Sequence, residues 1–411
     1  MKSLKNYLSE AASKNTHMTH LEDLIIDGGV SGARQAIMAL RSLRDMLKGS
    51  ASSSVDVTVK WDGAPAIFCG QDPSDGVFFV AKKGVFNKNP KVYKSNADVD
   101  ADIAAGDLND KMKAALKYLP SLGIKGVIQG DFLFGPGDLK KKTIEGKEYV
   151  VFHPNTIVYA VPVEQAKELL SAKIGIVWHT TYKGSSFETM GASYGVDVKK
   201  LKKSTAVWSQ NALRDVSNAT MSEKDTEEVN KYLSEAGKLF NQIAGSTLRA
   251  LEQNQELAGM IETFNNSFVR SGTIITDSTK HADNLIKYIH AKFQKEMDKR
   301  STEKGKTAQA DKRDALLAFF SPENKSSLIK MFELQRVMVL AKLKLINKLN
   351  DLKKIDTFVK TSNGYKVTGE EGYVAIDTLG GDAVKLVDRM EFSYNNFSPD
   401  IIKGWDKPNR N

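Results

Sequence analysis

The segment Val57-Thr58-Val59-Lys60-Trp61-Asp62-Gly63-Ala64-Pro65-Ala66 decides which fold and which chemistry we expect. The β-rich run predicts a strand that ends at Lys60, and Asp62-Gly63 is typical of a turn into the next strand. A lysine amine can attack the α-phosphorus of a nucleoside triphosphate when burial and neighbouring charges lower its pKa. Lys60 is therefore a candidate nucleophile. The alternative is a solvated lysine at the end of an ordinary hairpin strand.

Short β-rich runs continue along the chain after this segment. Turn signals such as Asp72-Pro73-Ser74-Asp75-Gly76 separate them, and one helix is expected around residues 108–119. Such a pattern is typical of mixed or antiparallel sheets with a few helices. The runs that we expect to be strands are Val55-Lys60, Ala66-Cys69, Val77-Ala81, Gly126-Phe134, Tyr149-Phe152, Thr156-Val161, Ile174-His179, Thr357-Val359, Gly364-Val367, Tyr373-Asp377 and Ala383-Val387.

Helical periodicity dominates two other parts of the chain. Apolar residues recur at helical spacing from Leu21 to Leu47, and again over long amphipathic stretches between Ala212 and Lys354. We therefore predict an α+β protein with a helical N-terminal segment (1–50), a β-rich domain in two parts (51–211 and 357–411) and a helical insertion (212–356) between them. The final strands should complete the sheet that begins at Val55.

The composition limits the class of protein. The chain has 411 residues, 41% of them hydrophobic, a formal net charge of +9 and one cysteine, Cys69, so no internal disulfide can form. No run of about 18 apolar residues is present, and we expect a soluble protein without a membrane partner. The positive charge fits a polyanionic partner such as nucleic acid, although a solvated lysine surface explains it equally well.

Several motifs follow Lys60 in an order that resembles the covalent nucleotidyltransferase superfamily of DNA ligases, RNA ligases and mRNA-capping enzymes. Lys60-Trp61-Asp62-Gly63 matches the nucleophile motif of that superfamily, and the resemblance covers the β-rich segments, roughly half of the chain. The later motifs are Phe79-Val80-Ala81-Lys82-Lys83-Gly84, Val127-Ile128-Gln129-Gly130-Asp131-Phe132-Leu133, Ile157-Val158-Tyr159-Ala160-Val161, Glu370-Glu371-Gly372-Tyr373-Val374-Ala375 and Ala383-Val384-Lys385-Leu386-Val387.

This resemblance implies a ligase-type nucleotidyltransferase domain and a role for each matching residue. Lys60 would carry AMP derived from ATP, and Glu371 would serve a Mg²⁺ or Mn²⁺ ion. The remaining implied roles are nucleotide binding by Asp62 and Gly63, phosphate contacts by Lys385 and by Lys82 or Lys83, a ribose contact by Asp131 in place of the usual glutamate, and base stacking by Tyr159.

Two of these roles have alternatives in the sequence. Tyr159 could equally be a core aromatic residue, in which case Trp178 or Tyr182 could stack on the base. Asp131 could instead cap the turn before Gly135.

The sequence departs from the superfamily pattern at two places. Val387 stands where a second lysine is usual, and strand alternation would place Arg389 on the same face as Lys385, where it could supply the missing charge. We also expect no C-terminal OB domain, so the helical insertion would have to grip a polynucleotide, and its removal should spare the first chemical step.

Two basic clusters are candidate nucleic-acid contacts. The denser one contains Lys199, Lys200, Lys202 and Lys203, which we expect to contact phosphates. A second cluster between Lys292 and Arg313 is interspersed with acidic residues, so a solvated helical face is an alternative there.

The function that we expect is ATP-dependent ligation of nicked or broken DNA or RNA by a monomer. The alternatives are transfer of a nucleotide to another acceptor, an RNA cap or a protein, and a non-catalytic virion protein that binds nucleic acid. The whole chain resembles a ligase-like family of tailed phages that infect marine bacteria. This implies a viral protein in the host cytoplasm or in the virion, and Leu8-Ser9-Glu10 resembles a phage maturation site that would release the first ten residues.

Overall fold

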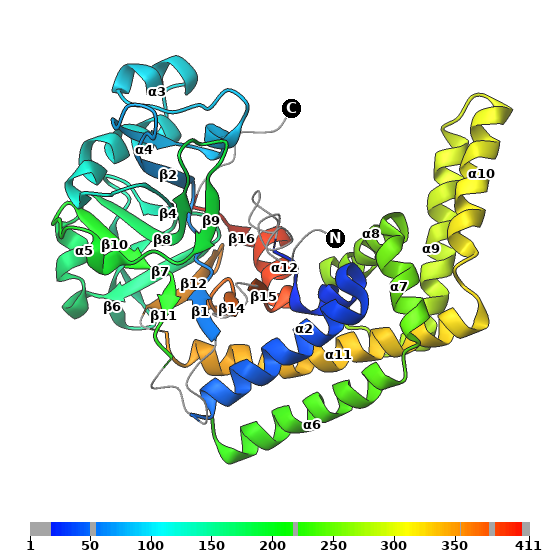
Figure 1. The fold of residues 1–411 in the computed structure, drawn as a ribbon. Helices are drawn as coiled ribbons and strands as arrows, with labels where there is room; N and C mark the ends of the chain where they lie inside the picture. Colours follow the sequence, from blue (N-terminus) through cyan, green and yellow to red (C-terminus); the bar gives the residue numbers. More distant parts are fainter. Residues whose placement is uncertain (1–17, 50–54, 217–220, 354, 378–382, 405–411) are drawn as a thin grey trace.

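The structure, a computed structural model, describes residues 18–49, 55–216, 221–353, 355–377 and 383–404. Its architecture is α+β, as predicted: β-sheets, mostly antiparallel, form one side of the molecule and long helices form the other (Figure 1). Among the described helices, none combines the length and apolar character needed to cross a membrane. The leader-like residues 1–10 lie outside the described ranges.

The central sheet has the strand order β10-β8-β4-β2-β3, and β9 also pairs with β8. Only the β10-β8 pair is parallel among these described strands. Helices α3 (Asn96–Asp102) and α4 (Asp107–Tyr118) cover one face, where they share an apolar core with the sheet. The strands are β2 (Ala66–Gln71), β3 (Phe78–Ala81), β4 (Val127–Phe134), β8 (Ile174–Lys183), β9 (Gly191–Tyr194) and β10 (Val207–Asn211).

A second, fully antiparallel sheet has the order β13-β12-β7-β6-β5, with β16 paired to β12. Apolar side chains from both sheets, such as Phe134 and Phe152, share one core. The strands are β5 (Lys140–Ile144), β6 (Lys147–Phe152), β7 (Ile157–Pro162), β12 (Asp356–Thr361), β13 (Gly364–Val367) and β16 (Ile401–Ile402). Two short elements, η4 (Val163–Gln165) and α5 (Lys167–Ser171), follow β7.

A four-stranded sheet, in the order β11-β1-β14-β15, pairs the first strand of the described chain with two strands near its C-terminal end. It contains β1 (Val55–Val59), β11 (Leu213–Arg214), β14 (Tyr373–Asp377) and β15 (Ala383–Leu386). Strands β1 and β14 are antiparallel, with Val59 opposite Tyr373. The prediction that the last strands complete the sheet begun at Val55 is therefore confirmed for β14 and β15, whereas the runs at 357–359 and 364–367 belong to the second sheet.

The helices form one body with this sheet. A single hydrophobic core contains Leu40 of α2, Leu233 of α6, Leu345 of α11, Val57 of β1 and Tyr373 of β14. The helical part is therefore not a separable insertion, and its removal would expose one face of the four-stranded sheet. The helices are α2 (Leu24–Leu47), α6 (Glu223–Asn241), α7 (Gly245–Gln253), α8 (Gln255–Arg270), α9 (Ser278–Asp298), α10 (Glu303–Leu317), α11 (Pro322–Asn350) and α12 (Arg389–Phe397).

Candidate functional site

Lys60 follows the last residue of β1, where three elements meet. Its backbone N–H donates to the Gly372 carbonyl at 2.8 Å, which continues the pairing of β1 with the β14 segment. Its side-chain amine forms an ion pair with Glu371, and it lies 5.7 Å from the ring centroid of Phe392 in α12. The side chain of Lys60 remains 34% exposed. The amine is therefore held by a carboxylate while one side of it stays open.

Two adjacent glutamates precede β14 and point to different partners. Glu371 pairs with Lys60, whereas Glu370 pairs with the Arg214 guanidinium at 3.2 Å. Burial raises the pKa of Glu371 to about 7, partly offset by Lys60, and burial raises the pKa of Glu370 to about 7, partly offset by Arg214. Glu371 alone of the two serves the Lys60 site.

Lys385 lies on the same side of the four-stranded sheet as this ion pair. Its Cα partner is Val374, whose partner on β1 is Thr58. Because the Lys60 N–H still pairs with Gly372, the alternation continues to Lys60 and puts it on the face of Thr58. Burial lowers the pKa of Lys385, and the charge of Lys60 lowers it further. The structure thus brings Lys60, Glu371 and Lys385 together, as the motifs predicted.

The predicted role of Arg389 is wrong. Strand β15 ends at Leu386, and Arg389 begins helix α12, where it pairs with Asp23 at 3.0 Å. Val387 is buried against Gly372. Neither residue therefore supplies a second charge next to Lys385, because strand alternation does not continue past the end of the strand.

Asp62 has a structural role in place of the predicted nucleotide contact. Its carboxylate accepts hydrogen bonds from Asn155 Nδ2 at 2.7 Å and from the backbone N–H groups of Thr156 and Ile157 at 2.6 and 2.8 Å. Burial raises its pKa. The carboxylate is occupied by these donors, and it anchors the turn after Lys60 to the start of β7.

Gly63 is required for a close approach between chain segments. A Cβ atom on Gly63 would lie 2.6 Å from Asp131 Cβ and 2.8 Å from the Phe132 carbonyl oxygen. Any side chain would therefore push the Lys60 turn away from β4. This contact, and not a ligand, explains the glycine.

Asp131 lies beside that turn with a partially open carboxylate. It pairs across the sheet with Ala66, and its side chain lies 3.4 Å from His179 Nε2. The alternative role as a turn cap is wrong, because Asp138 accepts the hydrogen bond from the Gly135 N–H at 2.7 Å. Asp131 remains available to a ligand next to Lys60, and sequence reasoning missed its neighbour His179.

Tyr159 does not fit the predicted base-stacking role. Its side chain has 0% exposure, and its ring lies between Trp61 at 4.9 Å and Phe152 at 5.3 Å. Its hydroxyl accepts the Asp62 N–H at 2.7 Å. Trp178 and Tyr182 are also buried. The core alternative describes Tyr159, and none of these three rings is open to a base.

Lys82 and the Lys199 cluster lie away from the ion pair. Lys82 is 3.5 Å from Asp102 on the α3 side of the central sheet, whereas Lys83 is exposed at the start of η2 (Lys83–Phe86). The Lys199 cluster begins within η5 (Val198–Lys200), and the Lys202 N–H donates to the Leu122 carbonyl on the α4 side. Asp131 points from the opposite face, because its neighbour Phe132 belongs to the α4-side core. The sites of Lys82 and of the Lys199 cluster are thus separated from Lys60 by the central sheet.

Helix α12, which sequence reasoning did not predict, covers one side of the site. Phe392 and Asn396 of α12 and Asp62 and Glu371 line a cavity of about 10 Å³, which is room for about one water. A nucleotide cannot enter there. Because the Lys60 side chain is 34% exposed, its amine is reached from outside this cavity.

The donor atoms at this site suit a hard cation only with help from a ligand. Within the described ranges, no group of three or more histidine, cysteine, aspartate or glutamate side chains could hold a metal ion. Glu371 offers one carboxylate, and Lys60 and Lys385 lie next to it. Mg²⁺ is commonly held by one or two carboxylates together with substrate phosphates and waters, so Glu371 could contribute one ligand to such an ion only together with a triphosphate.

Comparison with known families matches residues 15–400 to a family described as "Family of unknown function (DUF6267)". No curated protein and no solved structure matches the chain. The matched residues include Lys60, Glu371 and Lys385.

Proposed function

The chain belongs to this family of unknown function, and we propose from the Lys60 site that it is an ATP-dependent polynucleotide ligase of the covalent nucleotidyltransferase type. One observation carries the proposal. Lys60 and Glu371, from distant parts of the sequence, form a partly buried ion pair, and Lys385 lies beside them on one sheet face. Unlike the fully buried Lys342, which also pairs with a carboxylate, Lys60 keeps 34% of its side chain exposed, so its amine stays accessible to a substrate.

In the proposed first step, the Lys60 amine attacks the α-phosphorus of ATP. A nitrogen–phosphorus bond forms, the bond to pyrophosphate breaks, and the proton of Lys60 passes to the paired Glu371 carboxylate. Lys385 stabilises the negative charge that develops on the phosphates. Glu371 would help to hold Mg²⁺ or Mn²⁺ when such an ion is present, and the ion would neutralise further charge on the triphosphate.

The later steps distinguish a ligase from other nucleotidyltransferases. The nucleotide passes from Lys60 to a 5′-phosphate end, and attack by a 3′-hydroxyl then joins the strands and releases AMP. Intact-protein mass spectrometry with ATP or GTP and Mg²⁺ tests the first step, because the protein should gain one nucleoside monophosphate. Nicked DNA, nicked RNA and hybrid duplexes then test sealing. An adduct without sealing on any duplex would favour a different acceptor.

Adduct formation should rise with pH through about 7. The pKa of Glu371 is raised to about 7, so below that value the carboxyl is protonated and can neither hold a cation nor accept the proton of Lys60. We expect the rate to fall about tenfold per pH unit below pH 7 and to level off above it. Because the folded-state pKa exceeds the ordinary value of 4.5, the same carboxyl makes the fold less stable as pH rises from about 4.5 to about 7.

Single-turnover rates between pH 5.5 and 8.5 measure this dependence. The variant Glu370→Gln is the control, since it removes the neighbouring carboxyl of similar pKa but not the partner of Lys60. The control should retain the rise with pH. A rate that does not change between pH 5.5 and 7 in the wild-type protein would contradict the assignment to Glu371.

We also propose that the hairpin of α9 and α10 contacts the polynucleotide. It projects from the helical body (Figure 1), and Lys295, Lys304 and Lys312 are exposed on it. Replacing all three with glutamate should weaken binding to nicked duplex. The slope of log K for binding against log salt concentration should become less steep by up to about 3, because each lost phosphate contact removes roughly 0.9 from it.

The matched control reverses the charge of Lys140, Lys141 and Lys142 on β5, which are also exposed. Fluorescence anisotropy at several salt concentrations compares the two triple variants. Both should form the Lys60 adduct at the wild-type rate, since neither cluster adjoins Lys60. Equal losses of affinity in the two variants would show non-specific attraction and would refute a hairpin site.

A further inference from the structure

The N-terminal residues 19–23 lie directly against the strand that carries Lys385. His20 forms a parallel bridge with Lys385, and the Lys385 backbone N–H donates to the Thr19 carbonyl at 3.2 Å. This edge pairing extends the four-stranded sheet by one short segment, here called the strap (residues 19–23). The backbone position of Lys385 therefore depends on the strap as well as on β14.

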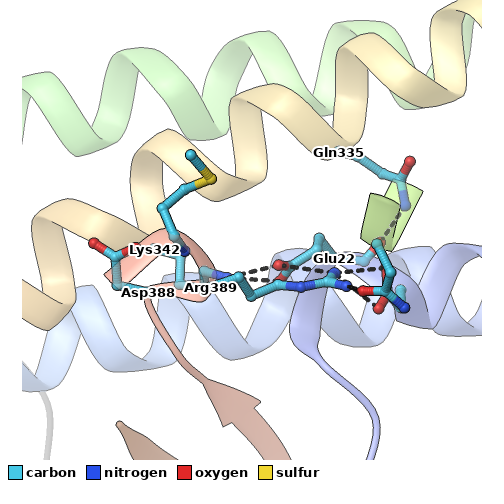
Figure 2. Close-up of polar contacts among 8 residues, drawn as sticks. Glu22, Gln335, Lys342, Asp388 and Arg389 are labelled. Carbon is cyan, nitrogen blue, oxygen red and sulfur yellow. Dashed lines mark hydrogen bonds and ion pairs between the residues drawn. The ribbon is translucent and has the colours of Figure 1, made fainter. Parts of the chain in front are cut away.

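Buried charges fix the strap to helix α11. Figure 2 shows Glu22 next to Lys342, and both oxygens of Glu22 accept from Lys342 Nζ at 2.8 Å. Gln335 Nε2 donates to the Glu22 carbonyl at 2.8 Å. Burial alone would raise the pKa of Glu22, but Lys342 and Arg389 outweigh it and hold this pKa at about 2. Glu22 is therefore ionised over the physiological range.

The strap also fixes helix α12 through Arg389. Nη1 of this guanidinium lies 3.0 Å from Asp23 and 3.5 Å from Glu22, while Nη2 donates to Asn266 of α8. Arg389 is the first residue of α12, and Phe392 of the same helix faces Lys60. The strap thus contacts both elements that enclose the amine, β15 through the backbone and α12 through charge.

Four buried charges are a costly way to stabilise a fold. A buried ion pair seldom stabilises a fold more than well-packed apolar side chains of similar volume would, because both charged partners lose their hydration. Directional hydrogen bonds between charged groups do, however, hold one geometry, and displacements of about 1 Å at a reacting centre can change rates by about a hundredfold. A requirement for geometry accounts for these residues better than stability does.

We infer that the strap is a positioning element of the Lys60 site, in which Glu22 and Asp23, acting through Arg389, and the backbone of residues 19–20 set the positions of Phe392 and Lys385. The inference rests on the proposed function for its catalytic consequence, since Lys385 is assigned to the phosphates there. Its structural part, that the strap keeps β15 and α12 in place, does not depend on any reaction.

Asp23→Asn tests this inference in the full chain. Asparagine has the same shape but loses the charge that holds Arg389, while the Glu22–Lys342 pair stays intact. We expect the rate constant for adduct formation to fall by about ten- to a hundredfold, with the KM for ATP changing less than threefold, because Lys385 acts mainly on charge in the transition state. Amide hydrogen exchange in the peptide containing Lys385 should accelerate at least fivefold.

Leu233→Ala is the matched control, since Leu233 is buried in the same core but belongs to α6 and not to the strap, β15 or α12. It should lower the thermal stability without a selective change in exchange at β15. Arg389→Lys, which keeps a charge for Asp23, should recover part of the rate relative to Arg389→Met.

The readouts separate two kinds of failure. If the wild-type protein forms no adduct while Asp23→Asn still accelerates exchange at β15 selectively, the proposed function fails and the positioning role stands. If Asp23→Asn changes neither exchange at β15 nor the rate, or if Leu233→Ala reproduces both effects, the inference is overturned.

Discussion

Lys60→Arg is expected to form no nucleotide adduct, a loss of about 10³-fold or more, which corresponds to roughly 4 kcal/mol of activation free energy. Arginine retains the positive charge and can still pair with Glu371, so nucleotide binding should largely persist. Its guanidinium stays protonated and is a poor nucleophile. Mass spectrometry after incubation with ATP and Mg²⁺, together with peptide mapping, measures the loss and locates the wild-type adduct.

Trp61→Phe serves as the control at the neighbouring position. Trp61 packs on Tyr159 at 4.9 Å, and its indole nitrogen has no hydrogen-bond partner among the described residues. Phenylalanine keeps the ring contact and loses no hydrogen bond of this kind, so the adduct should form at a rate within about threefold of wild type. An adduct on a residue other than Lys60, or an adduct on Lys60→Arg, would end the assignment of the nucleophile.

The strands were largely predictable, because β-rich runs between turn signals identify them without tertiary information. Each run expected from residues 55–179 and 357–387 overlaps a strand of the structure. The strands that were missed are short or polar, such as the lysine-rich β5 (Lys140–Ile144) and the two-residue β11. These strands form because they pair with neighbouring strands, and the local sequence gives little indication of that pairing.

The site was only partly predictable, because motif order identifies residue types but not their neighbours. Lys60, Glu371 and Lys385 do come together. Tyr159, however, lies in a strand with every residue buried, and such a strand has no polar face to show which side chains a ligand can reach. The aspartate of the Lys60 motif is likewise used to hold the turn in place.

The largest departure concerns the helical part of the chain. Amphipathic periodicity predicted helices between residues 212 and 356, but it could not show that they share a core with α2 and with the four-stranded sheet. For the same reason the charges that join Glu22, Lys342 and Arg389 were not foreseen. Those contacts depend on which faces pack together, a property of the whole chain.

Glu371→Ala is expected to reduce adduct formation by about a hundredfold or more while changing stability little. The substitution removes the group paired with Lys60 and the carboxylate that would hold a cation. It also removes a buried carboxyl whose pKa is raised to about 7, so the loss of the ion pair is offset by relief of that burial. Lys60 stays 34% exposed and can be hydrated by water.

Glu370→Ala should have the opposite pattern, although the two residues are adjacent and the pKa of each carboxyl is raised to about 7. It leaves the Arg214 guanidinium, whose side chain is 11% exposed, without its carboxylate, which should lower the free energy of unfolding by roughly 3 kcal/mol. Adduct formation at a temperature where this variant is folded should stay within about threefold of wild type. Chemical denaturation and single-turnover rates, measured on both variants at pH 8, give the comparison. If both glutamates affect rate and stability in the same proportion, then Glu371 stabilises the fold and has no separate role in the reaction.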